Sequence, residues 1–269
     1  MRCLYRERRY YCGDYLEVDI YPVFKKQNGR GRRAKPTSEV QAKLNQHNAE
    51  QKLIRILNEN FTLDDIEIHL TYSDENLPET PEEVTRDYQN YLRRIKRLRT
   101  KLGLPEMKYV VVPAGGYEDT RFHIHITMTG GVDRTLVEEM WGYGYANSRR
   151  LQFNENGVEG LARYVARQFV AHQGEELPFG KRWSGSRNLV IPQPQDRDGK
   201  LSQTKVKELA TGVSRETFEE LYEGYRLSEV RPFHNDVNGG YYLHVKLYRN
   251  GTRFANNRKR KKKYKEDIS

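Results

Sequence analysis

Two histidines stand two positions apart in the segment RFHIHITMTG, residues 121–130. Apolar and polar residues alternate along this segment, and the alternation predicts a β-strand whose successive side chains point to opposite faces. His123 and His125 therefore share one face, and two imidazoles about 7 Å apart along a strand can converge on one divalent cation. The pair predicts half of a metal site, and the alternative is two half-exposed histidines of a polar sheet face.

The other face of this strand is apolar, and it carries Phe122, Ile124, Ile126 and Met128. We expect this face to pack on helices and the histidine face to be relatively polar and open. No His-x-x-x-His pair occurs in the chain, and its two cysteines both lie near the N-terminus. A protease-type or finger-type zinc site is therefore not expected.

A tyrosine lies off the apolar stripe of a helix predicted over residues 158–171. The stripe has helical spacing and consists of Val158, Leu161, Ala162, Val165 and Phe169. Tyr164 lies roughly 100° or more from the centre of the stripe, because each residue turns a helix by about 100°. Arg167 follows one turn later. Tyr164 is thus expected at a partly exposed position near an arginine, and the alternative is a boundary tyrosine that packs sideways.

Strands and helices that would position these residues follow one another along the chain. The expected strands cover residues 1–23, 66–72, 108–114, 121–130 and 240–250. The expected helices cover residues 38–58, 80–101, 135–140, 158–171 and 214–225, with Thr80 as an N-cap and Gly103 as a stop. Residues 141–150 and 177–194 are predicted as loops. Hairpinned strands with helices against them indicate an α+β fold, with a central antiparallel sheet and flanking helices.

The composition indicates a globular protein with a polyanionic partner. The chain has 269 residues, a formal net charge of +10, and 31% charged and 11% aromatic residues, enough aromatics to fill a core. Nucleic acid is the first candidate partner and an anionic membrane surface the second. No apolar run approaches the roughly 20 residues of a membrane span, and the N-terminal segment has no apolar stretch typical of a signal peptide. An intracellular, reducing location is therefore expected.

Basic segments with interspersed aromatic residues suit nucleic acid. The segment KRWSGSRN, residues 181–188, offers cations for phosphates and an aromatic ring for an unpaired base. The candidate DNA-contacting residues are Lys181, Arg182, Trp183, Arg187 and Arg121. The alternative for the segment is a surface loop with Trp183 tucked into the core. Arg30, Arg32, Arg33 and the run at 258–263 are expected to make nonspecific DNA contacts.

Several motifs taken together resemble one known group of proteins. They are FHIHITMTG, the W-G-x-G at residue 141, GLARYVAR, KRWSGSRNL and the strand IEIHLTYSDENLP. The chain from about residue 10 to 250 resembles the rolling-circle replication initiator (Rep) proteins of the HUH endonuclease superfamily, found in bacterial plasmids, phages and mobile elements. The name of the superfamily refers to a His-hydrophobic-His motif, here His123-Ile124-His125.

The resemblance implies a metal-dependent nickase and strand transferase that acts at a replication origin. It implies that His123, His125 and a third polar residue hold Mg²⁺ or Mn²⁺ beside the scissile phosphate. It also implies that Tyr164 attacks phosphorus and forms a 5′-phosphotyrosine intermediate. Arg167 stands where the family often has lysine, so it keeps a positive charge but does not supply a proton in the way lysine can.

The third metal ligand is left open by the resemblance. Family members commonly carry a glutamate on the preceding strand, where this chain has about Ala114. We take Glu118 as the third ligand, with Asp119, His69 and water as alternatives. His69 shares a face with Glu67 in its own predicted strand, and it qualifies if that strand neighbours the histidine strand.

The expected elements and the resemblance together divide the chain and suggest its partners. Residues 1–60 are expected to form an N-terminal extension, 61–195 the nuclease core, 196–250 a C-terminal helix and strand, and 251–269 a basic disordered tail. No Walker A motif is present, so the expected partners besides single-stranded or hairpin origin DNA are a host helicase and DNA polymerase, in a bacterial cytoplasm. The alternatives are a relaxase or transposase of the superfamily, with the motif order against a relaxase, or a non-catalytic nucleic-acid-binding protein. A second tyrosine, Tyr143 or Tyr145, is not required.

Overall fold

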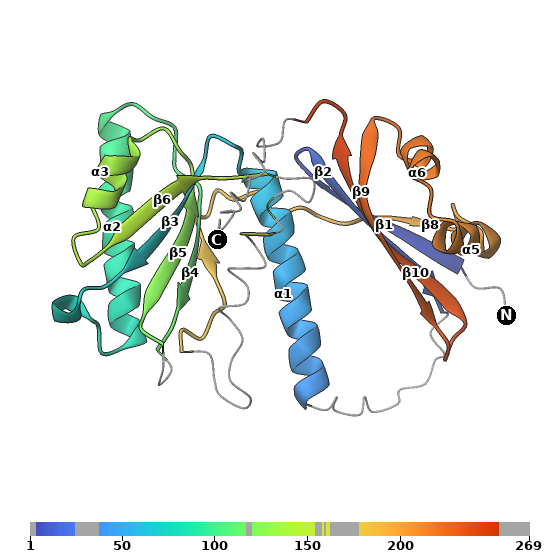
Figure 1. The fold of residues 1–269 in the computed structure, drawn as a ribbon, viewed down its shortest axis with the longest axis horizontal. Helices are drawn as coiled ribbons and strands as arrows, with labels where there is room; N and C mark the ends of the chain where they lie inside the picture. Colours follow the sequence, from blue (N-terminus) through green and yellow to red (C-terminus); the bar gives the residue numbers. More distant parts are fainter. Residues whose placement is uncertain are drawn as a thin grey trace, which may run out of the picture.

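Two antiparallel sheets enclose one long helix in a computed structural model of the protein (Figure 1). The structure describes residues 4–24, 38–116, 120–153, 158, 160–161 and 178–252, with side chains described from residue 44 onward in the first helix. Each sheet has five strands. Further helices cover the outer face of each sheet, so the layers run helix, sheet, helix, sheet, helix (Figure 1).

The first sheet contains the histidine strand at its centre, in the order β6-β3-β5-β4-β7. Its strands are β3 (Ile66–Thr71), β4 (Tyr109–Ala114), β5 (His123–Met128), β6 (Ala146–Arg150) and the two-residue β7 (Ser184–Gly185). All its neighbouring strands are antiparallel, and β4 and β5 form the expected hairpin pair. Helices α2 (Pro81–Lys101) and α3 (Arg134–Glu139) lie on its outer face, and a 3-10 turn, η1 (Asp74–Asn76), follows β3.

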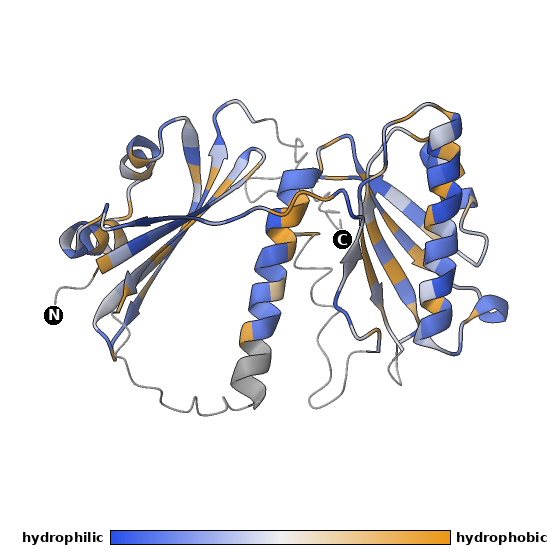
Figure 2. Ribbon diagram, turned by 180° about the vertical axis from the view of Figure 1, so that it is seen from behind, coloured by the Kyte–Doolittle hydropathy of each residue, from blue (hydrophilic) through white to orange (hydrophobic). Residues whose placement is uncertain are grey.

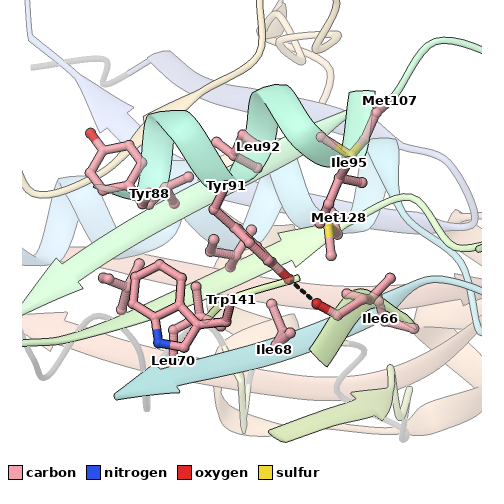
Figure 3. Packing of buried hydrophobic residues seen from close by; sticks show 14 of the residues in the cluster. Ile66, Ile68, Leu70, Tyr88, Tyr91, Leu92, Ile95, Met107, Met128 and Trp141 are labelled. Carbon is pink, nitrogen blue, oxygen red and sulfur yellow. Dashed lines mark hydrogen bonds between the residues drawn. The ribbon is translucent and has the colours of Figure 1, made fainter. Parts of the chain in front are cut away.

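Helix α2 begins and ends where its capping residues predict. The hydroxyl of Thr80 accepts a hydrogen bond from the backbone N–H of Glu83, which satisfies one of the free donors of the first turn. Gly103 follows the helix with φ +65°, a conformation that favours glycine. Tyr88, Tyr91, Leu92 and Ile95 turn toward the sheet (Figure 3). The expectation that Ile124, Ile126 and Met128 pack under a helix is confirmed.

Two aromatic residues dominate this core. Trp141 is fully buried, and its indole N–H donates to the carbonyl of Thr71 at 2.7 Å. Tyr91 packs edge-to-face on Trp141, with ring centroids 5.6 Å apart, and its hydroxyl donates to the carbonyl of Val137 at 2.9 Å. The pair therefore ties α2 to β3 and α3.

Replacing Tyr91 with phenylalanine should reduce the free energy of unfolding by about 1–2 kcal/mol, because the carbonyl of Val137 would lose its buried partner while the ring packing stays. Urea denaturation would measure the loss. The matched control is Tyr242→Phe, whose hydroxyl accepts from the side chain of Asn238 at an exposed site, and which should change stability by less than about 0.5 kcal/mol. Equal effects of both substitutions would contradict the role of this buried hydrogen bond.

The second sheet combines the two ends of the chain, in the order β8-β1-β2-β10-β9. Its strands are β1 (Leu4–Cys12), β2 (Tyr15–Val23), β8 (Gln195–Asp198), β9 (Tyr225–Asn235) and β10 (Gly240–Arg249). Helices α5 (Gln203–Thr211) and α6 (Arg215–Leu221) cover its outer face and bury Val206 and Phe218 against Val18 and Val245. Residues expected in two separate additions thus share one sheet.

Helix α1 (Ser38–Asn60) lies between the two sheets (Figure 1). Its hydrophobic residues cluster in the C-terminal half (Figure 2), where Leu53, Ile54, Ile56 and Leu57 are almost completely buried. The same hydrophobic cluster includes Tyr15 and Tyr248 from the second sheet and Val110 and Val112 from the first. One shared core therefore holds the two sheets against α1.

The α+β class with antiparallel sheets is confirmed, and several element boundaries are corrected. Residues 146–150 form an edge strand rather than the predicted loop. The sequence did not predict this strand because apolar and polar residues do not alternate in ANSRR. The helix expected over 214–225 ends at Leu221, and residues 225–235 form a strand in which every residue is partly or fully exposed. The helix expected over 158–171 and the tail fall mostly outside the described residues. No helix among the described residues has the length and apolarity to cross a membrane.

Candidate metal centre

Three histidines from two adjacent strands meet on one face of the first sheet. His69 on β3 pairs directly with His125 on β5, and Thr71 pairs with His123. Directly paired residues of antiparallel strands share a face, so His69, His123 and His125 all lie opposite α2. Each imidazole has a nitrogen within 4.8 Å of a nitrogen of the other two. That spacing suits three ligands around one cation.

The three rings lie at fixed angles to one another. His69 and His125 stack with centroids 4.5 Å apart and an interplanar angle of 5°. His123 meets both rings edge-on, with centroid distances of 5.3 Å. Stacked imidazoles present their nitrogens side by side, and the third ring closes the group from its edge. All three imidazoles thus come from two directly paired strands.

Neighbouring groups orient two of the imidazoles. The Nδ1 atom of His123 lies 3.0 Å from the carbonyl oxygen of Arg121, so a proton on Nδ1 leaves the Nε2 lone pair for a ligand. Behind His125, a carboxylate oxygen of Glu67 lies 3.7 Å from Nδ1. The other oxygen of Glu67 accepts from Nε of Arg149 at 2.6 Å. A carboxylate behind an imidazole is the usual support of a histidine that binds metal.

The electrostatics favour a neutral, ligating His69. Burial and the neighbouring imidazoles of His125 and His123 lower the pKa of His69 to about 4. Burial alone would raise the pKa of Glu67, but the nearby imidazole of His125 and the hydrogen bond from Arg149 lower it on balance, so Glu67 stays ionised. The Nε2 atom of His69 is buried and has no hydrogen-bond partner among the described residues. A metal ion would satisfy this atom.

The donor set also bears on which metal fits. Imidazole nitrogens are ligands of borderline softness, which suit first-row transition metals such as Zn²⁺ and Fe²⁺; Mn²⁺ is the weakest binder of that series, whereas Mg²⁺ prefers oxygen ligands and keeps several waters. Of the two ions expected from the sequence, Mn²⁺ therefore fits His69, His123 and His125 better than Mg²⁺.

Acid should destabilise the metal-free protein through His69. The pKa of His69 is about 4 in the folded protein, against about 6.5 for an unperturbed histidine in the unfolded chain. Between these values the unfolded chain binds a proton that the folded chain does not, so stability falls as the pH drops from 6.5 to 4. The partly exposed site limits the effect to on the order of 1–2 kcal/mol. Thermal midpoints in EDTA should fall less steeply in this window for His69→Gln than for wild type, and identical slopes would contradict the shifted pKa.

A pocket of about 480 Å³ opens beside the histidines, and it is lined by Glu67, His69, His125, Tyr145, Asn147 and Arg149. Strand β6 supplies one wall of the pocket. Gly144, just before β6, packs so closely on the segment after β3 that a Cβ there would lie 2.5 Å from the backbone nitrogen of Ser73. Tyr143 and Tyr145, the two candidates for a second tyrosine, have different surroundings. Tyr145 is 68% exposed and lines the pocket, whereas Tyr143 packs on Trp141 in the apolar core.

The histidine face is less open than expected. His125 is 2% exposed and Thr127 is 6% exposed, so the prediction of an open face is wrong at these positions. The reason lies in the next strand, where Val112 pairs with His125 and packs in the cluster around α1. Access to the cluster is therefore from the side of β6, through the pocket.

The structure brings together only part of the predicted site. His123 and His125 converge as expected, and of the alternatives for the third ligand it is His69 that joins them. Glu118 and Asp119 lie outside the described residues, as do the predicted nucleophile Tyr164 and its neighbour Arg167. Their roles stay predictions.

The predicted DNA-contacting residues have mixed surroundings. The guanidinium of Arg121 lies 2.6 Å from Asp74 and also donates to the carbonyl of Tyr72, so it is already engaged by the segment after β3. Arg182 donates to the side chain of Gln46 on α1. Lys181, Trp183 and Arg187 line a second pocket, described below.

Sequence reasoning missed Arg149 and gave Glu67 no role. Alternation along IEIHLT does place Glu67 on the face of His69, so that signal was present. The segment ANSRR gives no signal that Arg149 contacts Glu67, because this contact depends on β6 pairing with β3 in the register that sets Arg149 opposite Glu67.

Comparisons with known proteins add no assignment. No protein-family model matches the chain, and no curated protein and no solved structure is significantly similar to it.

Proposed function

We propose that this protein is a metal-dependent endonuclease and strand transferase that nicks and rejoins single-stranded DNA at a replication origin, as the Rep-like motifs suggest. The observation that carries the proposal is the convergence of His69, His123 and His125 beside a pocket. Glu67 supports one of these imidazoles, and Arg149 stands at the pocket wall. A cation site next to an arginine suits a phosphodiester.

The proposed reaction needs positioning and charge neutralisation more than covalent machinery. A bound divalent ion would polarise the scissile phosphate. The phenolic oxygen of Tyr164 attacks phosphorus, the bond from phosphorus to the 3′ oxygen breaks, and the 3′-OH leaves with a proton. A 5′-phosphotyrosine remains. It retains the energy of the phosphodiester, so a free 3′-OH can later attack it and rejoin the strand without ATP. Arg149, and Arg167 near the tyrosine, would balance the charge of the phosphate.

The few described residues next to Tyr164 support its place in this reaction. Leu161 is helical and packs against the cluster that contains Val110 and Val112. Val112 pairs with His125, so the two share a face of the sheet. The described start of the helix thus lies against the same face as the histidines.

A covalent-adduct assay tests the proposal. The full chain would be mixed with a labelled pool of random single-stranded DNA and origin-like hairpins, with Mn²⁺, with Mg²⁺ or with EDTA. The expected result is an SDS-resistant protein–DNA band that requires metal and is stronger with Mn²⁺. Tight binding of the pool with no adduct in any metal would overturn it. The second candidate, a non-catalytic nucleic-acid-binding protein, would then be favoured by the basic groove described next.

In the cell, we propose a bacterial cytoplasmic setting, with a host helicase and DNA polymerase acting on the nicked strand. A relaxase or transposase of the same superfamily would use the same site chemistry on different DNA ends. Sequencing the DNA that is trapped in the adduct would separate these cases, because origin nicking predicts one internal cleavage position in a recurrent sequence.

A further inference from the structure

A second pocket, of about 700 Å³, follows the edge of the first sheet on the side of α2. Its walls come from three places: α2, strand β4 and residues 179–187 around β7. Tyr109 and Pro113 line it, and in β4 these alternate with Val110 and Val112, which pack toward α1. The pocket therefore lies on the sheet face opposite the histidines. We call it the α2 groove.

The α2 groove is strongly basic. Four cations line it: Arg93, Lys96, Lys181 and Arg187. No carboxylate is among its lining residues. Within the described part of the chain, none of the four cations forms an ion pair, although the structure has many elsewhere. Three of them are exposed, and Lys96 is half-buried. Cations gathered in a groove with no described carboxylate in its lining attract a polyanion.

Aromatic side chains stand between these cations. Tyr109, Phe179 and Trp183 line the groove and are each partly exposed. Trp183 also packs against the hydrophobic cluster around α1, and the ammonium of Lys52 lies 5.7 Å from the centroid of its ring. The ammonium of Lys96 lies 4.9 Å from the ring centroid of Tyr109, so cation and ring alternate within a short distance. This combination is typical of sites that bind single-stranded nucleic acid, because the cations neutralise its phosphates while the aromatic rings stack on its unpaired bases. A duplex keeps its bases stacked on each other and cannot use the rings.

We propose that the α2 groove binds single-stranded nucleic acid, with phosphates on Arg93, Lys181 and Arg187 and bases stacked on Trp183 and Tyr109. The proposal deepens the proposed function, from which it takes DNA as the polymer, but it does not depend on cleavage. The groove and the histidines occupy opposite faces of the sheet. The nucleotides held in the groove are therefore not those whose phosphate lies at the metal site. The groove would hold a flanking stretch of the substrate strand.

Intrinsic fluorescence gives a direct readout of this site. The chain has two tryptophans, and Trp141 is fully buried. A base that stacks in the groove should therefore quench Trp183 selectively. The probe is oligothymidylate of about 12 nucleotides, within the roughly 4–16 nucleotides of single-strand sites of this kind, titrated into the full chain in EDTA so that cleavage does not interfere. We expect saturable quenching, which Trp183→Phe should abolish.

Salt dependence identifies the phosphate contacts. Arg93→Gln, Lys181→Gln and Arg187→Gln should each weaken binding several-fold and reduce the slope of log K against log [salt] by about 0.7. The matched control is Arg97→Gln, an exposed arginine of the same helix outside the groove, which should leave the slope nearly unchanged. Thermal midpoints would show that all four variants fold. Slopes equal to that of the control, or tighter binding of a duplex than of the single strand, would overturn the proposal.

Cleavage and groove binding can fail separately. Groove binding is measured in EDTA, where metal-dependent cleavage does not occur, so its result does not depend on the histidines. Quenching without any adduct in the wild-type assay would reject the nuclease and retain the groove. An adduct whose yield and salt dependence are unaffected by the three groove variants would retain the nuclease and reject the groove.

Discussion

Replacing Tyr164 with phenylalanine should abolish the covalent adduct between protein and DNA, with a fall of about 10⁴-fold or more in its rate of formation. Phenylalanine removes only the oxygen that attacks phosphorus, and no other atom of the side chain can form the phosphodiester. Binding of the strand should change little, because the hydroxyl is not needed for contacts to phosphates or bases. The measurement is a single-turnover adduct assay with Mn²⁺, together with binding in EDTA.

The matched control for this experiment is Tyr145→Phe. Tyr145 lines the pocket beside His69 and His125 and is largely exposed, so it is the described tyrosine best placed to compete with Tyr164. We expect Tyr145→Phe to retain most of the adduct. If the adduct instead survived in Tyr164→Phe and disappeared in Tyr145→Phe, the nucleophile would come from the segment before β6. Peptide mapping of the trapped adduct would confirm the assignment independently.

Replacing His69 with alanine should reduce the affinity for Mn²⁺ at least about 100-fold, since substitutions behind the ligands of a metal site alone cost roughly 10–100-fold. A direct ligand contributes more, because its loss leaves two imidazoles and water. The affinity would be measured by calorimetry or by electron paramagnetic resonance of Mn²⁺, without any DNA. Adduct formation should fall in parallel.

Glu118→Gln discriminates between the two sources of a third ligand. Glu118 was the third ligand expected from the sequence, with His69 among the alternatives, whereas the geometry places His69 against His123 and His125. If His69 is the ligand, Glu118→Gln should bind Mn²⁺ within about threefold of wild type, a difference of less than about 0.7 kcal/mol. His234→Ala, at a half-exposed histidine of the other sheet, controls for the loss of any imidazole. A larger loss in Glu118→Gln than in His69→Ala would restore the original assignment.

The sequence by itself determined the local chemistry of the candidate site. Alternation along RFHIHITMTG placed His123 and His125 on one face and the apolar residues on the other, because the side-chain period of a strand is two. The same rule placed Glu67 with His69. The cap at Thr80 and the stop at Gly103 likewise followed from local rules, and both are confirmed. These features depend on residues close together in the chain.

Only the tertiary structure decided which histidine completes the cluster. His69 lies 54 positions before His123 in the sequence, and its role depends on β3 pairing with β5 in the register that sets it opposite His125. A shift of one residue would have turned it to the apolar face. Arg149 joined Glu67 for the same kind of reason. The second sheet was not predicted either, because in it β2 pairs with β10, a strand that lies more than 200 residues later in the chain. Periodicity reports which face a residue occupies, but the partner of a strand is set by packing over the whole chain.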